Sequence, residues 1–134
     1  MKIRTFQAAD FEGVRRLWAS TEGLGVGPGD KRESVVHFLD RNPGLSLVAV
    51  DMGAIVASVL CGHDGRRGYI YRLAVGPDYR NQGLAKDLVR RCLAGLKAAG
   101  IERCLALVQE DNEGARRFWE KMDGKLRTDL VGFS

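Results

Sequence analysis

One stretch decides the fold of this chain: Leu73-Ala-Val-Gly-Pro-Asp-Tyr-Arg-Asn-Gln-Gly-Leu-Ala-Lys86. It predicts an apolar strand, a turn, a short loop and the start of an amphipathic helix. The loop carries Arg80, Gly83 and Ala85 in an R-x-x-G-x-A arrangement, and glycine lets the backbone approach a ligand closely. Free amides at the start of a helix, aided by the helix dipole, form a site for phosphate. We therefore expect the backbone here to bind a phosphorylated cofactor.

Length and composition are those of one small globular domain. The chain has 134 residues, of which 45% are hydrophobic and 28% charged, so we expect a single domain over residues 1–134 with one core. No apolar run approaches the length of a membrane span, and the first residues lack the apolar stretch of a signal peptide. We therefore expect a cytoplasmic protein with no membrane partner.

Cysteines, histidines and charge exclude other classes of site. Cys61, Cys92 and Cys104 are widely spaced without a C-x-x-C pair, which is typical of reduced core residues. The two histidines are too few and too scattered to form a metal site with them, so we expect no metal. A net charge of +4 favours anionic ligands, but the basic residues form no concentrated block. Nucleic acid is therefore the weaker interpretation of this charge.

The remaining sequence predicts a mixed order of strands and helices. Asp10 can cap one helix, and Asp30 with Glu33 forms a capping box for the next. The glycine-rich segment 22–30 between them is expected to be a loop, either merely flexible or covering a substrate pocket. The crossover from strand 69–75 to strand 101–108 requires parallel pairing if the two are neighbours. The expected strands are 2–6, 45–50, 54–61, 69–75, 101–108 and 125–133, and the expected helices are 10–20, 30–41, 83–99 and 112–122.

Two common phosphate-binding motifs do not match this sequence. A P-loop requires G-x-x-x-x-G-K-[ST], and the chain has no such Lys-Ser/Thr ending. The glycines at positions 23, 25, 27 and 29 lack the spacing of a dinucleotide fingerprint, and they follow a predicted helix rather than a strand. The loop at Arg80–Ala85 is therefore of another kind.

Two segments together resemble the GNAT superfamily of N-acetyltransferases, in its small single-domain bacterial form. Arg80-Asn-Gln-Gly-Leu-Ala85 is similar to the cofactor motif of that family, and Asn112-Glu-Gly-Ala-Arg-Arg-Phe-Trp-Glu-Lys121 is similar to its Asn-x-x-Ala-x-x-Phe-Tyr-x-Lys helix. The element order agrees over nearly the whole chain. The resemblance implies an α/β (α+β) fold, with a mixed central sheet of about six to seven strands flanked by four helices. This sheet would be splayed between two central parallel strands, around Leu73 and Leu105.

The resemblance also implies how coenzyme A would bind. The backbone of the strand before the motif would pair with the pantetheine arm, and the amides of the loop would hold the pyrophosphate. Asn112 would bond to the arm or order the adjacent loop. Arg80, Lys86 and Arg116 are implied phosphate partners, with a solvated surface position as the alternative for each. The implied cofactor-binding residues are Leu73, Ala74, Val75, Arg80, Asn81, Gln82, Gly83, Leu84, Ala85, Lys86, Asn112 and Arg116.

The implied chemistry is direct transfer of an acetyl group from a thioester to an amine. A backbone amide at Val75 or its neighbour would polarise the acetyl carbonyl, and a base must remove a proton from the amine. The carboxylate that relatives often carry on the central strand is missing, which leaves His63, Asp64 and Glu22 as candidate bases. Histidine is a residue type that suits a base at neutral pH, which favours His63, with an ordinary loop histidine as the alternative.

Trp119 occupies the position of the tyrosine that many relatives use as a general acid. An indole cannot donate a catalytic proton, so Tyr69, Tyr71 or water would replace it, and Trp119 is expected to pack over the cofactor. The loss is limited because a departing thiolate is only weakly basic. The catalytic candidates are therefore Val75, His63 and Tyr71.

The expected function is transfer of an acetyl group from acetyl-CoA to a primary amine, on a small molecule or a protein. Acetyl-CoA and this acceptor are the expected partners, and a homodimer is left open. Arg66, Arg67 and Arg72 would bind an acidic group of the acceptor or simply lie exposed. Two alternatives come from other classes: a non-catalytic acyl-CoA-binding module of the same fold, and a nucleic-acid-binding domain, which the cofactor loop disfavours.

Overall fold

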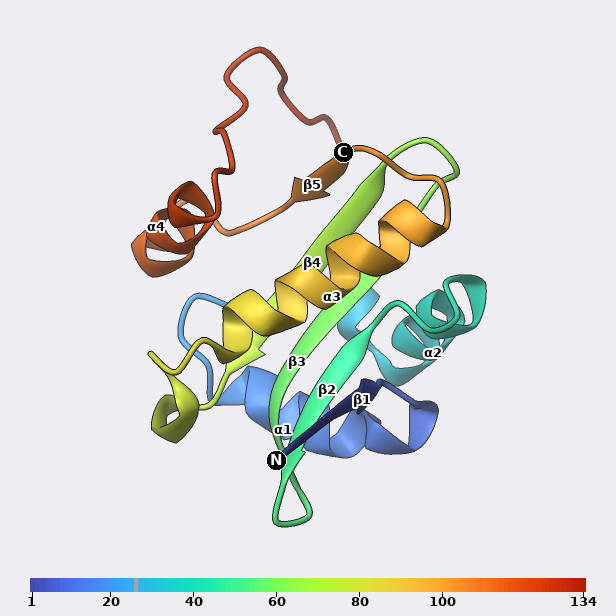
Figure 1. The fold of residues 1–134 in the computed structure, drawn as a ribbon, viewed down its shortest axis with the longest axis vertical. Helices are drawn as coiled ribbons and strands as arrows, with labels where there is room; N and C mark the ends of the chain where they lie inside the picture. The colour runs from blue at the N-terminus through green and yellow to red at the C-terminus, as the bar shows by residue number, and fades with distance from the viewer. Residues whose placement is uncertain (26) are drawn as a thin grey trace.

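The computed structural model describes residues 1–25 and 27–134. Five strands in these residues form one sheet in the order β1-β2-β3-β4-β5. Its strands are β1 (Lys2–Thr5), β2 (Leu47–Asp51), β3 (Ala54–His63), β4 (Gly68–Val75) and β5 (Cys104–Ala106). The helices are α1 (Phe11–Ala19), α2 (Arg32–Arg41), α3 (Leu84–Ala98) and α4 (Glu113–Lys121), with short 3-10 turns at Ala8–Asp10, Pro28–Asp30 and Pro77–Tyr79. Figure 1 shows α3 crossing one face of the sheet, with α1 and α2 behind it.

The sheet is antiparallel from β1 to β4, and β5 then joins it in parallel. β2 and β3 form a hairpin, whose turn holds Met52 at φ 50° and Gly53 at φ 80°. Two consecutive left-handed residues match the twist of a two-residue hairpin. The parallel pairing of β4 with β5 confirms the crossover predicted through α3, and with it the mixed α/β fold.

Alternate residues of the strands pack on opposite faces of the sheet, so β3 contributes to two buried clusters. On the face towards α3 the cluster includes Ala57, Val59, Cys61, Leu88 and Leu96. On the face towards α1 it includes Val14, Trp18, Val48, Leu60 and Ala74. The buried residues of α1 and α3 recur at helical spacing, so each helix packs one side on the sheet.

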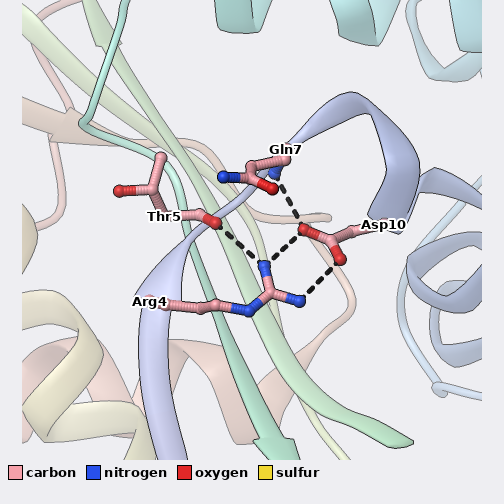
Figure 2. A network of polar contacts seen from close by, with 4 residues as sticks. All are labelled: Arg4, Thr5, Gln7 and Asp10. Carbon is pink, nitrogen blue, oxygen red and sulfur yellow. Dashed lines mark hydrogen bonds and ion pairs between the residues drawn. The ribbon is translucent and has the colours of Figure 1, made fainter. Parts of the chain in front are cut away.

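An ion pair between Arg4 and Asp10 fixes the turn before α1 (Figure 2). The Arg4 guanidinium donates to both carboxylate oxygens of Asp10, at 2.7 and 2.8 Å. The same carboxylate accepts the backbone N–H of Gln7 at 2.8 Å, and Arg4 also donates to the Thr5 carbonyl. The Arg4 hydrogen bond is the main cause that lowers the pKa of Asp10. Asp10 precedes α1 as predicted, but its carboxylate closes the preceding turn and does not cap the helix.

The capping box predicted at Asp30 and Glu33 is wrong. The N-cap residue of α2 is Lys31, which makes no side-chain cap. The Asp30 carboxylate instead accepts the backbone N–H of Gly27 at 2.7 Å and forms an ion pair with Arg72 of β4 at 3.4 Å. A charged partner from a strand distant in sequence draws the carboxylate away from the helix start.

The predicted strand over residues 125–133 is wrong, and the strand predicted at 101–108 is shorter. Residues 125–133 form no helix or strand, and β5 holds three residues. The described sheet has five strands where six to seven were expected, with β5 at its edge. An apolar pattern specifies a strand only where a neighbouring strand and a core face receive it. In the described part of the chain, residues 125–133 have neither a neighbouring strand nor a core face to pack on: the exposed fractions lie between 51% and 96% for Leu126, Leu130, Val131 and Phe133.

Candidate active site

A cleft of about 970 Å³ opens between β4, the start of α3, the segment after α1 and the segment from β5 into α4. Most of the predicted cofactor residues line it, namely Leu73, Ala74, Val75, Arg80, Asn81, Gly83, Leu84, Ala85, Lys86 and Asn112. Of the catalytic candidates, Val75 and Tyr71 line the cleft as well. The fold thus brings two sequence motifs, from either side of α3, to one cavity.

β4 and β5 separate after a short stretch of pairing. They pair over residues 68–70 and 104–106, and the next bond, from the Leu107 N–H to the Ile70 carbonyl, is 3.4 Å long. β4 continues to Val75, so residues 71–75 have no partner in β5. The split predicted between two parallel strands is therefore present, at the edge of the described sheet.

The backbone of β4 offers hydrogen-bonding groups to this split. The Gly76 N–H donates to the Val56 carbonyl of β3 at 2.8 Å. Because successive residues of a strand direct their N–H groups to opposite sides, the Val75 N–H is turned away from β3 and towards the split. Arg80 borders the same place, since its Nε donates to the Val75 carbonyl at 3.0 Å. An unpaired strand edge of this kind can bind an extended chain that contains amides.

A β-bulge interrupts β4 in the middle of the cleft. Between residues 58 and 60 of β3, one residue stands opposite two of β4, Arg72 and Leu73. Arg72 has φ 55°, a left-handed conformation that is uncommon for a residue with a long side chain. The extra residue reverses the alternation, so consecutive side chains share one side: Tyr71 packs edge-to-face on Phe38, and Arg72 lies over the ring of Trp18.

The loop before α3 presents free amides to the cleft. Gly83 is the N-cap residue of α3 and has φ 82°, which favours glycine. The Asp87 N–H donates to the Gly83 carbonyl at 3.0 Å, and no N-cap side chain bonds to the helix. The N–H groups of Leu84, Ala85 and Lys86 therefore have no helical partner, and all three residues line the cleft. Their geometry fits a phosphate group.

A side-chain hydrogen bond ties the turn before this loop to β2. Tyr79 donates its hydroxyl to Asp51 Oδ2 at 2.7 Å, and Tyr79 itself lines the cleft. Asp51 is the last residue of β2, and this hydrogen bond is the main cause that raises the pKa of Tyr79. Together with the bond from Gly76 to β3, the contact holds the turn against the sheet and so fixes where the loop begins.

The glycine-rich segment forms another wall of the cleft, which is one of the two alternatives expected for it. Residues 21–25 line the cleft together with residues 107–110. A Cβ on Gly23 would lie 2.3 Å from the Asn112 side chain, and a Cβ on Gly25 would lie 3.1 Å from Gln109. The two glycines therefore permit close packing between segments that are far apart in the sequence.

Three of the predicted cofactor-binding residues form hydrogen bonds with neighbouring backbone groups of the protein. Asn112 accepts the Ala115 N–H at 3.1 Å, which caps α4, and it donates to the Gly23 carbonyl at 3.4 Å. It thus orders the adjacent loop, the second of the two roles implied for it. Arg116 donates to the Glu110 carbonyl and Gln82 to the Asp78 carbonyl, each at 3.1 Å, and neither residue lines the cleft.

The candidate bases divide between the cleft and the turn that joins β3 to β4. His63 ends β3, where its Nδ1 accepts the Gly65 N–H at 3.0 Å, and it does not line the cleft. Asp64 accepts two backbone N–H groups of the same turn at 2.8 Å, which lower its pKa, and it too lies outside the cleft lining. Glu22 lines the cleft. Of these three candidate bases, Glu22 is therefore the one whose position in the cleft suits a base.

Tyr71 and Trp119 both line the cleft. Tyr71 stacks on Tyr69 with ring centroids 5.8 Å apart, and burial is the main cause that raises the pKa of its hydroxyl. The phenol therefore stays protonated at neutral pH and can donate a hydrogen bond. Trp119 packs edge-to-face on Phe118 at 5.2 Å and against the cluster of α3, so it acts as a packing residue of the wall.

One protein-family model matches most of the chain, that of the Acetyltransferase (GNAT) family, over residues 10–124. The chain belongs to this family. Its curated relatives include an acetyltransferase of Yersinia enterocolitica, 41% identical over 131 residues, which cover 98% of this chain and 92% of that protein. An acetyltransferase of Pectobacterium atrosepticum is 38% identical over 92% of this chain and 86% of that protein. The protein is therefore a GNAT acetyltransferase.

Solved GNAT structures share this fold at low sequence identity. An aminoglycoside 6'-N-acetyltransferase of Acinetobacter haemolyticus has a TM-score of 0.81 at 17% identity, covering 100% of this chain and 97% of that one. The PaiA N-acetyltransferase of Thermoplasma acidophilum, solved in complex with coenzyme A, has a TM-score of 0.77 at 19% identity, covering 98% and 92%. At these identities the likeness shows the fold alone.

Residues 1–25 and 27–134 contain no group of three His, Cys, Asp or Glu side chains that could hold a metal ion. None of the helices in these residues has the length and apolar character needed to cross a membrane. Cys61 and Cys92 are buried and free, as expected of core residues, whereas Cys104 is exposed because it lies on the edge strand β5.

Proposed function

We propose that this GNAT protein transfers the acetyl group of acetyl-CoA to a primary amine, on a small molecule or a protein. The observation that supports this most directly is the unpaired stretch of β4, residues 71–75, which leads to the uncapped N-terminus of α3. A ligand with a pyrophosphate at one end and an amide-containing arm at the other matches both features at once. Coenzyme A has this form.

The residues at the start of α3 and along β4 fit two parts of coenzyme A. The amides of Leu84, Ala85 and Lys86 would bind the pyrophosphate, and the backbone of Leu73 and Val75 would bind the arm. A Cβ built on Gly83 would meet no protein atom within 4 Å, so the space above the loop is free for a ligand. When bound, acetyl-CoA supplies a thioester carbonyl for acyl transfer.

Groups on two walls of the cleft would serve the reaction. The Val75 N–H would donate to the carbonyl oxygen, where negative charge develops. Glu22 would accept a proton from the acceptor amine, because a protonated ammonium has no lone pair with which to attack. Holding both reactants in one cleft supplies proximity. After attack the nitrogen loses its second proton, and the departing thiolate takes up a proton in turn. Because this thiolate is only modestly basic, it needs little help from a general acid, which is consistent with Trp119 in place of a tyrosine.

The solved neighbours leave the identity of the amine open. Their names include aminoglycoside acetyltransferases and the NatB acetyltransferase complex. An aminoglycoside is a small molecule, and the second name does not specify an acceptor. We therefore propose only that the acceptor group of this protein is a primary amine.

Acetyl-CoA is expected to raise the melting temperature of the protein, because a ligand that binds only the native state stabilises it by about 2.7 kcal/mol at a hundred times its Kd. The test is a thermal-shift titration followed by a thiol-release assay against a panel of amines and peptides. Thiol release that depends on an amine would support transfer. A thermal shift without turnover on any acceptor would favour the non-catalytic acyl-CoA-binding module, and no shift at millimolar acetyl-CoA would contradict the proposal.

Tyr79→Phe is expected to weaken acetyl-CoA binding by a few-fold, because it removes the hydrogen bond to Asp51 that anchors the turn before the cofactor loop. Isothermal titration of the variant with acetyl-CoA measures this loss. Tyr69→Phe is a matched control, since it removes the same hydroxyl group from a residue of β4 that does not line the cleft. Equal affinities for the native protein and Tyr79→Phe would show that the contact does not position the loop.

A further inference from the structure

Arg72 is a largely buried cation in the cleft wall, with its side chain 13% exposed, so it is not the simple surface residue that the sequence allowed. Its Cζ lies 4.6 Å from the centre of the Trp18 ring, and Nε forms an ion pair with Asp30 at 3.4 Å. Nη1 donates to the Gly25 carbonyl. Nε is buried without a hydrogen bond to any described residue. A cation removed from water in this way depends on its few partners.

These contacts join three parts of the fold. Trp18 belongs to α1, and its indole N–H donates to Ser58 of β3 at 3.0 Å, so the stacking surface is itself fixed. Gly25 and Asp30 lie in the glycine-rich segment. Arg72 reaches this side of the sheet only because the bulge in β4 sets it in a left-handed conformation. The bulge of β4 is thereby connected to the wall of the cleft.

We propose that Arg72 is a positioning residue for the acceptor half of the site, an inference that rests on the proposed acetyl transfer. By holding Gly25 and Asp30, Arg72 keeps Glu22 and Leu24 in the wall of the cleft. Its described polar contacts lie in the glycine-rich segment and none lies in the cofactor loop, residues 80–86. The contacts of Arg72 with Gly25 and Asp30 therefore affect acceptor binding and the position of the proton acceptor Glu22. They leave the affinity for acetyl-CoA unchanged.

Two variants test this inference at the two ends of the ion pair. Arg72→Met removes the charge and the bond to Gly25, whereas Asp30→Asn removes the ion pair but leaves the bulge and an oxygen for the Gly27 N–H. We expect both variants to lower kcat/KM for the acceptor by about ten- to a hundredfold, since a small displacement of a reacting group has this effect. The Kd of acetyl-CoA should stay within about twofold. Arg72→Lys keeps the charge and should restore part of the activity.

Hydrogen exchange gives a readout that does not depend on turnover. Peptides that span residues 22–30 should exchange faster in Arg72→Met and Asp30→Asn than in the native protein. Arg15→Met is a matched control, because Arg15 also forms an ion pair, with Glu12 of α1, but lies outside the cleft lining. Unchanged exchange, native acceptor kinetics, or an equal loss of acetyl-CoA affinity would each overturn the inference. A native protein without turnover on any amine would count against the proposed function alone, and exchange would still decide whether Arg72 holds the segment.

Discussion

Gly83→Val is expected to abolish detectable binding of acetyl-CoA while the chain remains folded. Gly83 has φ 82°, and a residue with a side chain adopts this left-handed conformation at a cost of about 1–2 kcal/mol. The new side chain meets no protein atom, because a Cβ at this position has nothing within 4 Å. It would instead occupy the space above the amides of α3 that a phosphate group requires. Isothermal titration with acetyl-CoA measures the loss.

Gly100→Val separates backbone strain from loss of the ligand site. Gly100 has φ 83° and lies just after α3, where a Cβ would again meet nothing within 4 Å. It does not line the cleft. We expect the two valine variants to show similar drops in melting temperature, and only Gly83→Val to lose the ligand. Native affinity in Gly83→Val, or an equal loss in both variants, would show that the loop is not the phosphate site.

The start of α3 could be predicted from the sequence because its determinants are local. A glycine after an apolar strand and before an amphipathic helix specifies both the turn and the left-handed residue within a few positions. Connectivity predicted that β4 and β5 would pair in parallel if they were neighbours, and the sheet makes them neighbours. The end of the chain had an equally good apolar pattern, yet Leu130 and Phe133 are exposed, because a strand also needs a neighbour that the pattern does not contain.

The catalytic side of the cleft depends on contacts that no local pattern reveals. Asp30 has the spacing of a capping residue but forms an ion pair with Arg72 instead. The position of Arg72 follows from the β-bulge in β4, and no glycine in the sequence marks that bulge. Tyr79 and Asp51 are 28 residues apart, and nothing near either one predicts their hydrogen bond. Residue type favoured His63 over Glu22 as the base, yet Glu22 lines the cleft and His63 does not. Which of the two reaches the cleft depends on how their loops fold, and neither residue type contains that information.

Glu22→Gln is expected to lower kcat for acetyl transfer by about 10²–10⁴-fold, the usual effect of removing a general base. The amide has nearly the same size as the carboxylate, so the wall of the cleft keeps its shape, but an amide cannot accept a proton from the acceptor amine. Glu22 is exposed in the cleft and is not part of the cofactor loop. The Kd of acetyl-CoA should therefore remain at its native value.

Glu110→Gln and His63→Gln are the controls that give this result its meaning. Glu110 is the second carboxylate in the described lining of the cleft, so its variant tests whether negative charge alone is sufficient. His63 is a second candidate base, but it bonds within its own turn, outside that lining. Steady-state kinetics at saturating acetyl-CoA should show near-native kcat for both variants. A large loss in His63→Gln with native activity in Glu22→Gln would place the base at the other end of β4, and the acceptor would then have to reach the catalytic carbonyl from that side.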